Sequence, residues 1–145
     1  MKPYADTSFL FSYYSTDGNS TRADMWRQAN AVPLPLTVLH RLELRNALEL
    51  AAFQQRSTPA EAAAAWNTVE IDLAAGLLVE SSIPLAELYQ DAEKLAVSHT
   101  AATGARSLDI LHVAAAQKLG ADEFVTFDQR QTTLARRIGL GTATL

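Results

Sequence analysis

Four acidic residues occupy positions from which their carboxylates can converge on one site. Asp6 ends a short apolar run, and Asp128 follows the strand-like segment EFVTF. The carboxyl ends of parallel strands meet at one edge of an open sheet, so both side chains are expected there. Glu43 lies in the predicted helix after the second strand. Asp109 lies in the first turn of a later helix, where the helix dipole favours an anion.

Such a group of carboxylates favours a divalent cation, because the acids repel one another unless a metal intervenes. Glu43 and Asp109 also interrupt apolar helix surfaces, where an acid needs a cation or a hydrogen-bond donor. The chain has no Cys and three His, so oxygen ligands favour Mg²⁺ or Mn²⁺ over Zn²⁺. Two such ions about 3.5–4 Å apart can hold the attacking and leaving oxygens of a phosphodiester. The predicted metal ligands and catalytic residues are Asp6, Glu43, Asp109 and Asp128.

Each acid also has a structural interpretation that involves no metal. Asp6 and Asp128 can each cap the helix that follows. Asp109 suits the first turn of a helix in any protein, and Glu43 can be a solvent-facing helix residue. Taken singly, the four positions leave both interpretations open.

Strands and helices alternate along the chain and must position these acids. Strands are predicted at 2–5, 32–37, 77–82, 123–127 and 140–145, and helices from 9 onward and at 20–31, 38–55, 59–75, 85–103, 108–119 and 129–138. The expected N-terminal caps are Thr7 or Ser8, Ser20, Thr37, Thr58 and Ser107. Strands separated by helices need crossover connections, which predicts an α/β fold with a mainly parallel sheet.

Length and composition predict a single domain over residues 1–145. Hydrophobic residues make up 48% of the chain, and no Pro-, Gly- or Ser-rich linker divides it. The lack of Cys, of a signal sequence and of a long apolar run favours a cytoplasmic protein without a membrane span. The formal charge of −4, from 16 acids and 12 Lys and Arg, disfavours holding nucleic acid by bulk attraction. Two divalent cations at the four acids would offset about four of these charges.

Three segments carry a resemblance to a known family. The opening YADTSFL and the segment LPLTVLHRLELRNAL bear the first two acids. The more specific segment is RSLDILHVAAAQKLGADEFVTFDQRQTTLARRIGL, with an Asp-bearing helix, a Gly-Ala-Asp turn and a Thr-Phe-Asp strand end in order. Together they resemble the PIN-domain family, and within it the bacterial and archaeal VapC toxins. The resemblance covers the whole chain and implies a three-layer α/β/α fold.

What the resemblance implies for function is a magnesium-dependent endoribonuclease, the toxin of a type II toxin–antitoxin pair. The four acids match the family's acidic quartet, and Thr126 and Ser8 match polar residues that often line that site. The resemblance also implies a small antitoxin as partner, a homodimer, and RNA products with a 3′-hydroxyl and a 5′-phosphate.

Four cations lie near the acids in sequence and are candidates for RNA phosphate contacts. They are Arg41, Arg45, Arg106 and Arg130. Arg130 is the first choice because it lies two residues after Asp128. The alternative is that these side chains pair with neighbouring acids at the surface. His112 falls among apolar residues and is expected to be a hydrogen-bonded core residue rather than a ligand.

Two other functions stay open. One is a different metal-dependent phosphoester hydrolase. An aspartyl phosphatase would normally carry a second Asp two residues after the first, where this chain has Ser8. The other is a catalytically idle module that keeps the fold for binding or regulation. The presence of all four acids speaks against that interpretation.

Overall fold

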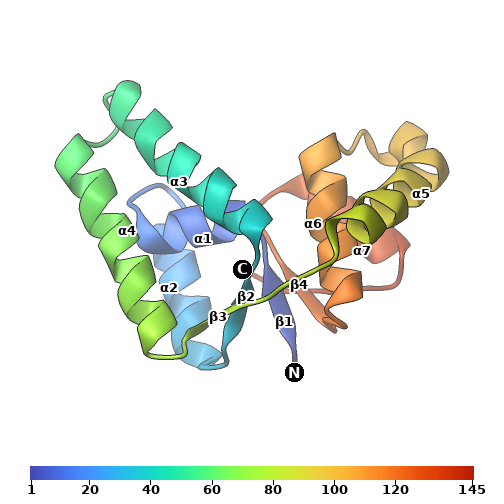
Figure 1. The fold of residues 1–145 in the computed structure, drawn as a ribbon, viewed down its shortest axis with the longest axis horizontal. Helices are drawn as coiled ribbons and strands as arrows, with labels where there is room; N and C mark the ends of the chain where they lie inside the picture. The colour runs from blue at the N-terminus through green and yellow to red at the C-terminus, as the bar shows by residue number, and fades with distance from the viewer. The chain divides into compact units, whose positions relative to one another are not determined.

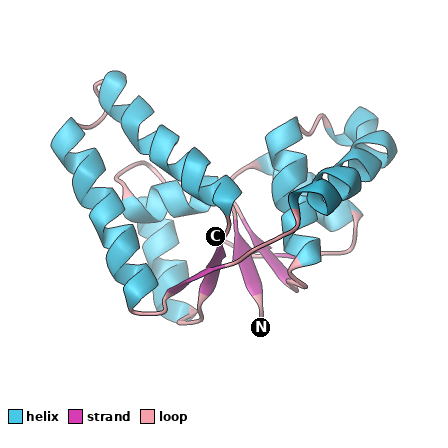
Figure 2. Cartoon of the chain, in the orientation of Figure 1, coloured by secondary structure: helices cyan, strands magenta, loops and turns pink.

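The computed structural model describes all 145 residues, which fold mainly as helices with short parallel strands (Figure 1, Figure 2). The chain forms two compact units. One unit comprises Met1–Asp6 and Ser82–Thr144, and the other comprises Thr7–Ser81 with Leu145. None of the helices combines the length and the apolarity that a bilayer span requires.

The unit that contains the N-terminus is a three-stranded parallel sheet with three helices. Its elements are β1 (Pro3–Ala5), α5 (Leu85–Thr103), α6 (Ser107–Lys118), β4 (Glu123–Val125), α7 (Gln129–Arg137) and β5 (Gly141–Thr142). The strand order is β1-β4-β5, and Ala5 pairs with Val125. A Cβ on Gly141 would lie 2.7 Å from the Asp122 carbonyl oxygen, so only Gly allows β5 to approach β4 this closely.

The core of this unit surrounds α6. Eight consecutive residues of that helix, Asp109–Ala116, are buried, because α5 and α7 both pack against it. His112 is among them, and its Nδ1 lies 2.8 Å from the Tyr4 hydroxyl oxygen of β1. Tyr4 in turn stacks on Phe124 of β4. His112 is thus a hydrogen-bonded core residue, as the sequence predicts.

The second unit pairs two parallel strands with four helices. Its elements are α1 (Thr7–Tyr14), α2 (Ser20–Ala29), β2 (Leu34–Leu36), α3 (Val38–Phe53), α4 (Pro59–Ala74) and β3 (Leu78–Glu80). Leu34 pairs with Leu78 in the β2–β3 ladder. The buried guanidinium of Arg27 donates to the backbone carbonyls of Asn30, Val32 and Leu77, which ties α2 to the start of both strands.

The structure confirms the α/β class and the parallel strand pairing. It differs from the expectation of one sheet, because the strands form two separate ladders. Pro33 precedes β2 and Pro35 lies within it. Neither residue has a backbone N–H, which limits the pairing of this short strand. The organisation of residues 1–145 as a single domain stays a prediction.

The predicted starts of α3, α4, α5 and α7 are correct, and at the other three helices the start or the cap differs by one or two residues. Thr37 and Thr58 cap α3 and α4, each through a capping box. Ser20 and Ser107 are the first residues of their helices rather than the caps, which are Asn19 and Arg106. The first helix starts at Thr7, two residues before the predicted start.

Candidate functional site

The first of the predicted acids, Asp6, lies at the carboxyl edge of the sheet in the first unit. Asp6 follows β1, is 1% exposed, and donates its backbone N–H to the carbonyl oxygen of Val125 at 3.0 Å. Thr126 follows β4 and is also buried. Because β1 and β4 are adjacent and parallel, Asp6 and Thr126 leave the sheet side by side.

Asp128 is the N-cap of α7. Its Oδ1 accepts the backbone N–H groups of Arg130 at 2.8 Å and Gln131 at 3.0 Å. Its own backbone N–H donates to Thr126 Oγ1 at 2.9 Å. The cap interpretation is therefore correct for this residue. The cap occupies Oδ1 alone, so a ligand role through Oδ2 is compatible with it.

Asp109 lies in the first turn of α6, as predicted, and is 8% exposed. Its Oδ2 accepts the backbone N–H of Arg106 at 2.9 Å. Its Oδ1 accepts the side-chain N–H of Gln131 at 3.1 Å. Gln131 therefore contacts both acids, Asp128 through its backbone and Asp109 through its side chain.

Gln131 was not predicted as a site residue. Its spacing from Asp128 is that of a capping box, in which a Gln at the third helical position turns back to the N-cap N–H. The sequence therefore indicates a local role for Gln131. Nothing in the sequence indicates that its side chain reaches a helix 22 positions away.

The negative charges of Asp109 and Asp128 are not balanced by a cationic side chain, since no Lys or Arg side chain forms an ion pair with either acid. The buried Asp109 carboxylate meets only neutral N–H groups, and the buried Oε1 of Gln131 accepts no hydrogen bond. No three His, Asp or Glu side chains lie close enough together to form a metal cluster. Mg²⁺ or Mn²⁺ does not require such a cluster, because it keeps several waters and binds through one or two carboxylates.

Glu43 belongs to the second unit, in α3. It is half-buried, and its Oε1 accepts a hydrogen bond from Thr7 Oγ1 at 3.1 Å. Thr7 directly follows Asp6 in the chain. Ser8, the residue predicted to line the site, is half-buried in α1, whereas Thr7 was predicted only as a helix cap. Because Glu43 lies in a different unit from the other three acids, the four-acid site stays a prediction.

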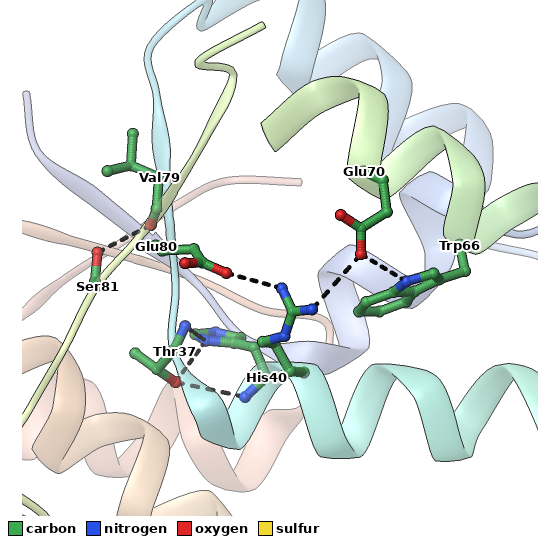
Figure 3. Close-up of polar contacts among 8 residues, drawn as sticks. Thr37, His40, Trp66, Glu70, Val79, Glu80 and Ser81 are labelled. Atoms are coloured by element: carbon green, nitrogen blue, oxygen red, sulfur yellow. Dashed lines mark hydrogen bonds and ion pairs between the residues drawn. The ribbon is translucent and has the colours of Figure 1, made fainter. Parts of the chain in front are cut away.

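Arg41 is held by carboxylates of its own unit. One guanidinium nitrogen lies 3.0 Å from Glu80 Oε1 and another lies 3.5 Å from Glu70 Oε1, as Figure 3 shows for Glu70 and Glu80. Glu70 also accepts the indole N–H of Trp66 at 2.9 Å. These contacts agree with the surface ion-pair interpretation of Arg41.

Arg45 shares a helix face with Arg41. The guanidinium carbon of Arg45 lies 4.4 Å from the centre of the Trp66 ring, and that of Arg41 lies 5.4 Å from it. A helix turns by about 100° per residue, so Glu43 points to the side of α3 opposite both arginines. The structure therefore does not bring Arg41 or Arg45 together with Glu43.

The two remaining cations lie beside the acids of the first unit. Arg106 is exposed, and its backbone N–H binds Asp109. Arg130 is half-buried in the first turn of α7, next to the Asp128 cap. Of the four predicted phosphate contacts, these two are the ones that the fold places next to predicted catalytic acids.

Comparison with known proteins agrees with this fold. The family model of the PIN domain matches residues 4–137, and the chain belongs to that family. No protein of curated function matches the chain in sequence.

The solved structures that share the fold include the following three. One is VapC20 from Mycobacterium tuberculosis, a sarcin–ricin loop cleaving toxin, with a TM-score of 0.70, 17% identity and coverage of 91% of this chain and 94% of that chain. PAE2754 from Pyrobaculum aerophilum has a TM-score of 0.61, 21% identity and coverage of 98% and 83%. FitAcB from Neisseria gonorrhoeae has a TM-score of 0.61, 17% identity and coverage of 98% and 96%. At these identities the similarity concerns the fold.

Proposed function

We propose that this PIN-domain protein is a Mg²⁺- or Mn²⁺-dependent endoribonuclease and the toxin of a toxin–antitoxin pair. The observation that carries the proposal is the link from Asp109 through Gln131 to Asp128, at the sheet edge where Asp6 also emerges. The buried Asp109 carboxylate, which has neutral donors and no cationic partner, suits a divalent cation. The similarity of the fold to the toxin VapC20 supports the toxin role.

In this proposal, Asp6, Asp109 and Asp128, together with Glu43, hold the cation directly or through water. When bound, the cation supplies charge for the scissile phosphate and lowers the pKa of a bound water. Hydrolysis then leaves a 3′-hydroxyl and a 5′-phosphate.

The chain's other residues position these groups. Thr126 fixes the backbone of Asp128 through the hydrogen bond from its N–H. Thr7 orients Glu43, and Ser8 is a second hydroxyl of the same turn. Arg130 and Arg106 hold phosphates of the RNA beside the acids.

The proposed partners are an RNA, a small antitoxin and a second copy of the chain, acting in the cytoplasm. A toxin of this kind must be restrained in its own cell. We expect the antitoxin to cover an apolar surface near the first helices and to direct a cation at the carboxylates. A structure of the natural complex with the acids untouched would contradict the second part of this expectation.

A cleavage assay tests the proposed activity. The purified chain is incubated with labelled RNAs, the first being a sarcin–ricin loop hairpin because VapC20 cleaves that loop. We expect cleavage with Mg²⁺ or Mn²⁺, none with EDTA, and none by an Asp109→Asn variant purified in the same way. Undiminished cleavage in excess EDTA would contradict the metal mechanism. A parent chain that cleaves no RNA with either cation would favour the idle binding module.

A further inference from the structure

The side chain of Gln131 binds Asp109 because Thr126 takes the hydrogen bond that helix capping would otherwise assign to Gln131. In a capping box, the third helical residue caps the N–H of the N-cap residue. Here Thr126 Oγ1 already accepts the Asp128 N–H, at 2.9 Å. Gln131 is thereby released from the local role that its position indicates, and its Nε2 donates to Asp109 Oδ1 instead.

The chemistry of the pair fixes which end of the amide faces Asp109. A carboxylate only accepts hydrogen bonds, so the Gln131 NH₂ group must face it and Oε1 must face away. Gln131 is 6% exposed, and its Oε1 is buried without a hydrogen-bond donor. A buried carbonyl oxygen without a donor costs free energy, unless water or a ligand supplies the hydrogen.

We propose that Gln131 is a positioning residue for the cation site: its Nε2 orients Asp109, and its Oε1 accepts a hydrogen from a water of the hydrated cation. This inference rests on the proposed function. It accounts for the two features of Gln131 that helix capping leaves unexplained, the bond to a distant acid and the buried acceptor beside it. Mg²⁺ suits the arrangement because it keeps most of its water shell.

The test measures cation affinity as well as cleavage. MgCl₂ and MnCl₂ are titrated calorimetrically into the full chain, into Gln131→Met and into Gln129→Met. Met preserves the length of Gln and removes both amide groups. Gln129 is the matched control, because it is exposed in the first turn of the same helix. Losing a group that orients a metal-binding side chain typically weakens metal affinity by about 10- to 100-fold.

We expect that loss for Gln131→Met and unchanged affinity for Gln129→Met. Cleavage by Gln131→Met should recover at high Mg²⁺, because the carboxylates themselves are intact. If Gln131→Met binds Mg²⁺ like a parent chain that cleaves RNA, the role of Gln131 is only structural and the inference is wrong. The proposed function would then still stand. If the parent itself neither binds these cations nor cleaves RNA, the proposed function fails and the inference fails with it.

A second variant keeps the test decisive if Gln131→Met does not fold. Gln131→Glu preserves the side-chain shape and places a second carboxylate against Asp109 Oδ1. We expect its melting temperature to fall below that of the parent in EDTA and to recover most of the difference in Mg²⁺, because the cation relieves the repulsion. An equal deficit with and without Mg²⁺ would also overturn the inference.

Discussion

Thr126 and Asp128 form a local pair in which the hydroxyl oxygen of one accepts the backbone N–H of the other at 2.9 Å. The bond spans two residues, but its effect reaches another helix. It satisfies the N–H that a capping box would otherwise assign to Gln131, whose side chain then binds Asp109. The Thr of the Thr-Phe-Asp motif is therefore linked by hydrogen bonds, through Asp128 and Gln131, to an acid that lies 17 residues earlier in the sequence.

The first prediction removes that acceptor. Thr126→Val keeps the side-chain shape and leaves the Asp128 N–H to be capped by Gln131, so that Asp109 loses its donor. We expect a loss of about 1–3 kcal/mol in the free energy of unfolding and weaker Mg²⁺ binding. Thr126→Ser should restore both. Urea unfolding in EDTA and calorimetric titration measure the two effects, and parent-like Mg²⁺ binding by Thr126→Val would contradict the coupling.

The second prediction concerns phosphate contacts. Arg130 lies beside the Asp128 cap, whereas Arg137 lies at the other end of α7 and is exposed. We expect Arg130→Ala to weaken RNA binding and to reduce the slope of log affinity against log salt by roughly one. Arg137→Ala is the matched control and should change the slope less. Binding of RNA to the Asp109→Asn variant at several salt concentrations measures this, and equal slopes for the two Ala variants would remove Arg130 from the site.

Most of the fold is predictable because its signals are local. Thr58, followed by Pro59 and then Glu61, defines a helix start with its capping box, and the structure has that start. Gly104 ends α5 in the left-handed conformation that a glycine adopts readily. The caps at Ser20 and Ser107 were each displaced by one residue, since a hydroxyl at the first helical position resembles a cap in sequence.

The site is less predictable because its contacts are long-range. The positions of Asp6 and Asp128 follow from strand ends in a parallel sheet, and the structure has both at that edge. The role of Gln131 depends on which side chain accepts the backbone N–H of Asp128. The capping-box pattern predicts Gln131 as the acceptor, whereas the structure has Thr126. The orientation of Arg45 away from Glu43 is predictable from the sequence, because residues two apart on a helix point to opposite sides.

The third prediction concerns alkaline stability. The hydroxyl of Tyr14 donates to Asp72 at 2.6 Å, and burial together with this carboxylate raises the pKa of Tyr14 well above 10. A raised pKa in the folded state gives stability that is complete below the pKa of the unfolded chain, about 10. Above that pH the unfolded chain loses the proton first, so the free energy of unfolding falls by up to about 1.4 kcal/mol per pH unit.

Tyr14→Phe removes this titration. We expect the variant to be less stable than the parent at pH 8, because Asp72 loses its donor, and the gap to narrow between pH 10 and 11.5. Urea unfolding across that range measures the gap. A gap that is constant with pH would mean that Tyr14 ionises alike in the folded and unfolded chains.

The fourth prediction begins with Asp109→Asn. The new amide can still accept the Arg106 N–H through its oxygen, but its NH₂ group then faces the NH₂ group of Gln131. Gln131 can turn its amide over, because its Oε1 has no donor to lose. We therefore expect this variant to lie within about 1 kcal/mol of the parent in EDTA, since the weaker neutral hydrogen bond is offset by the smaller cost of burying an uncharged amide. It should nevertheless lose cleavage and most of its stabilisation by Mg²⁺.

Combining Asp109→Asn with Gln131→Glu places the amide at position 109 and the carboxylate at position 131. One donor and one carboxylate are thereby kept between α6 and α7. Gln131→Glu alone sets two carboxylates against each other in a buried position, which should lower the free energy of unfolding. The double variant should recover most of that loss. In a double-mutant cycle of the parent, the two single variants and the double variant, all measured in EDTA, we expect a coupling energy of about 1–3 kcal/mol in the free energy of unfolding. Cleavage should stay absent from the double variant, because its carboxylate lies on α7 rather than at position 109. Additive single effects would mean that the two side chains do not depend on each other, and the hydrogen bond between them could then not orient Asp109.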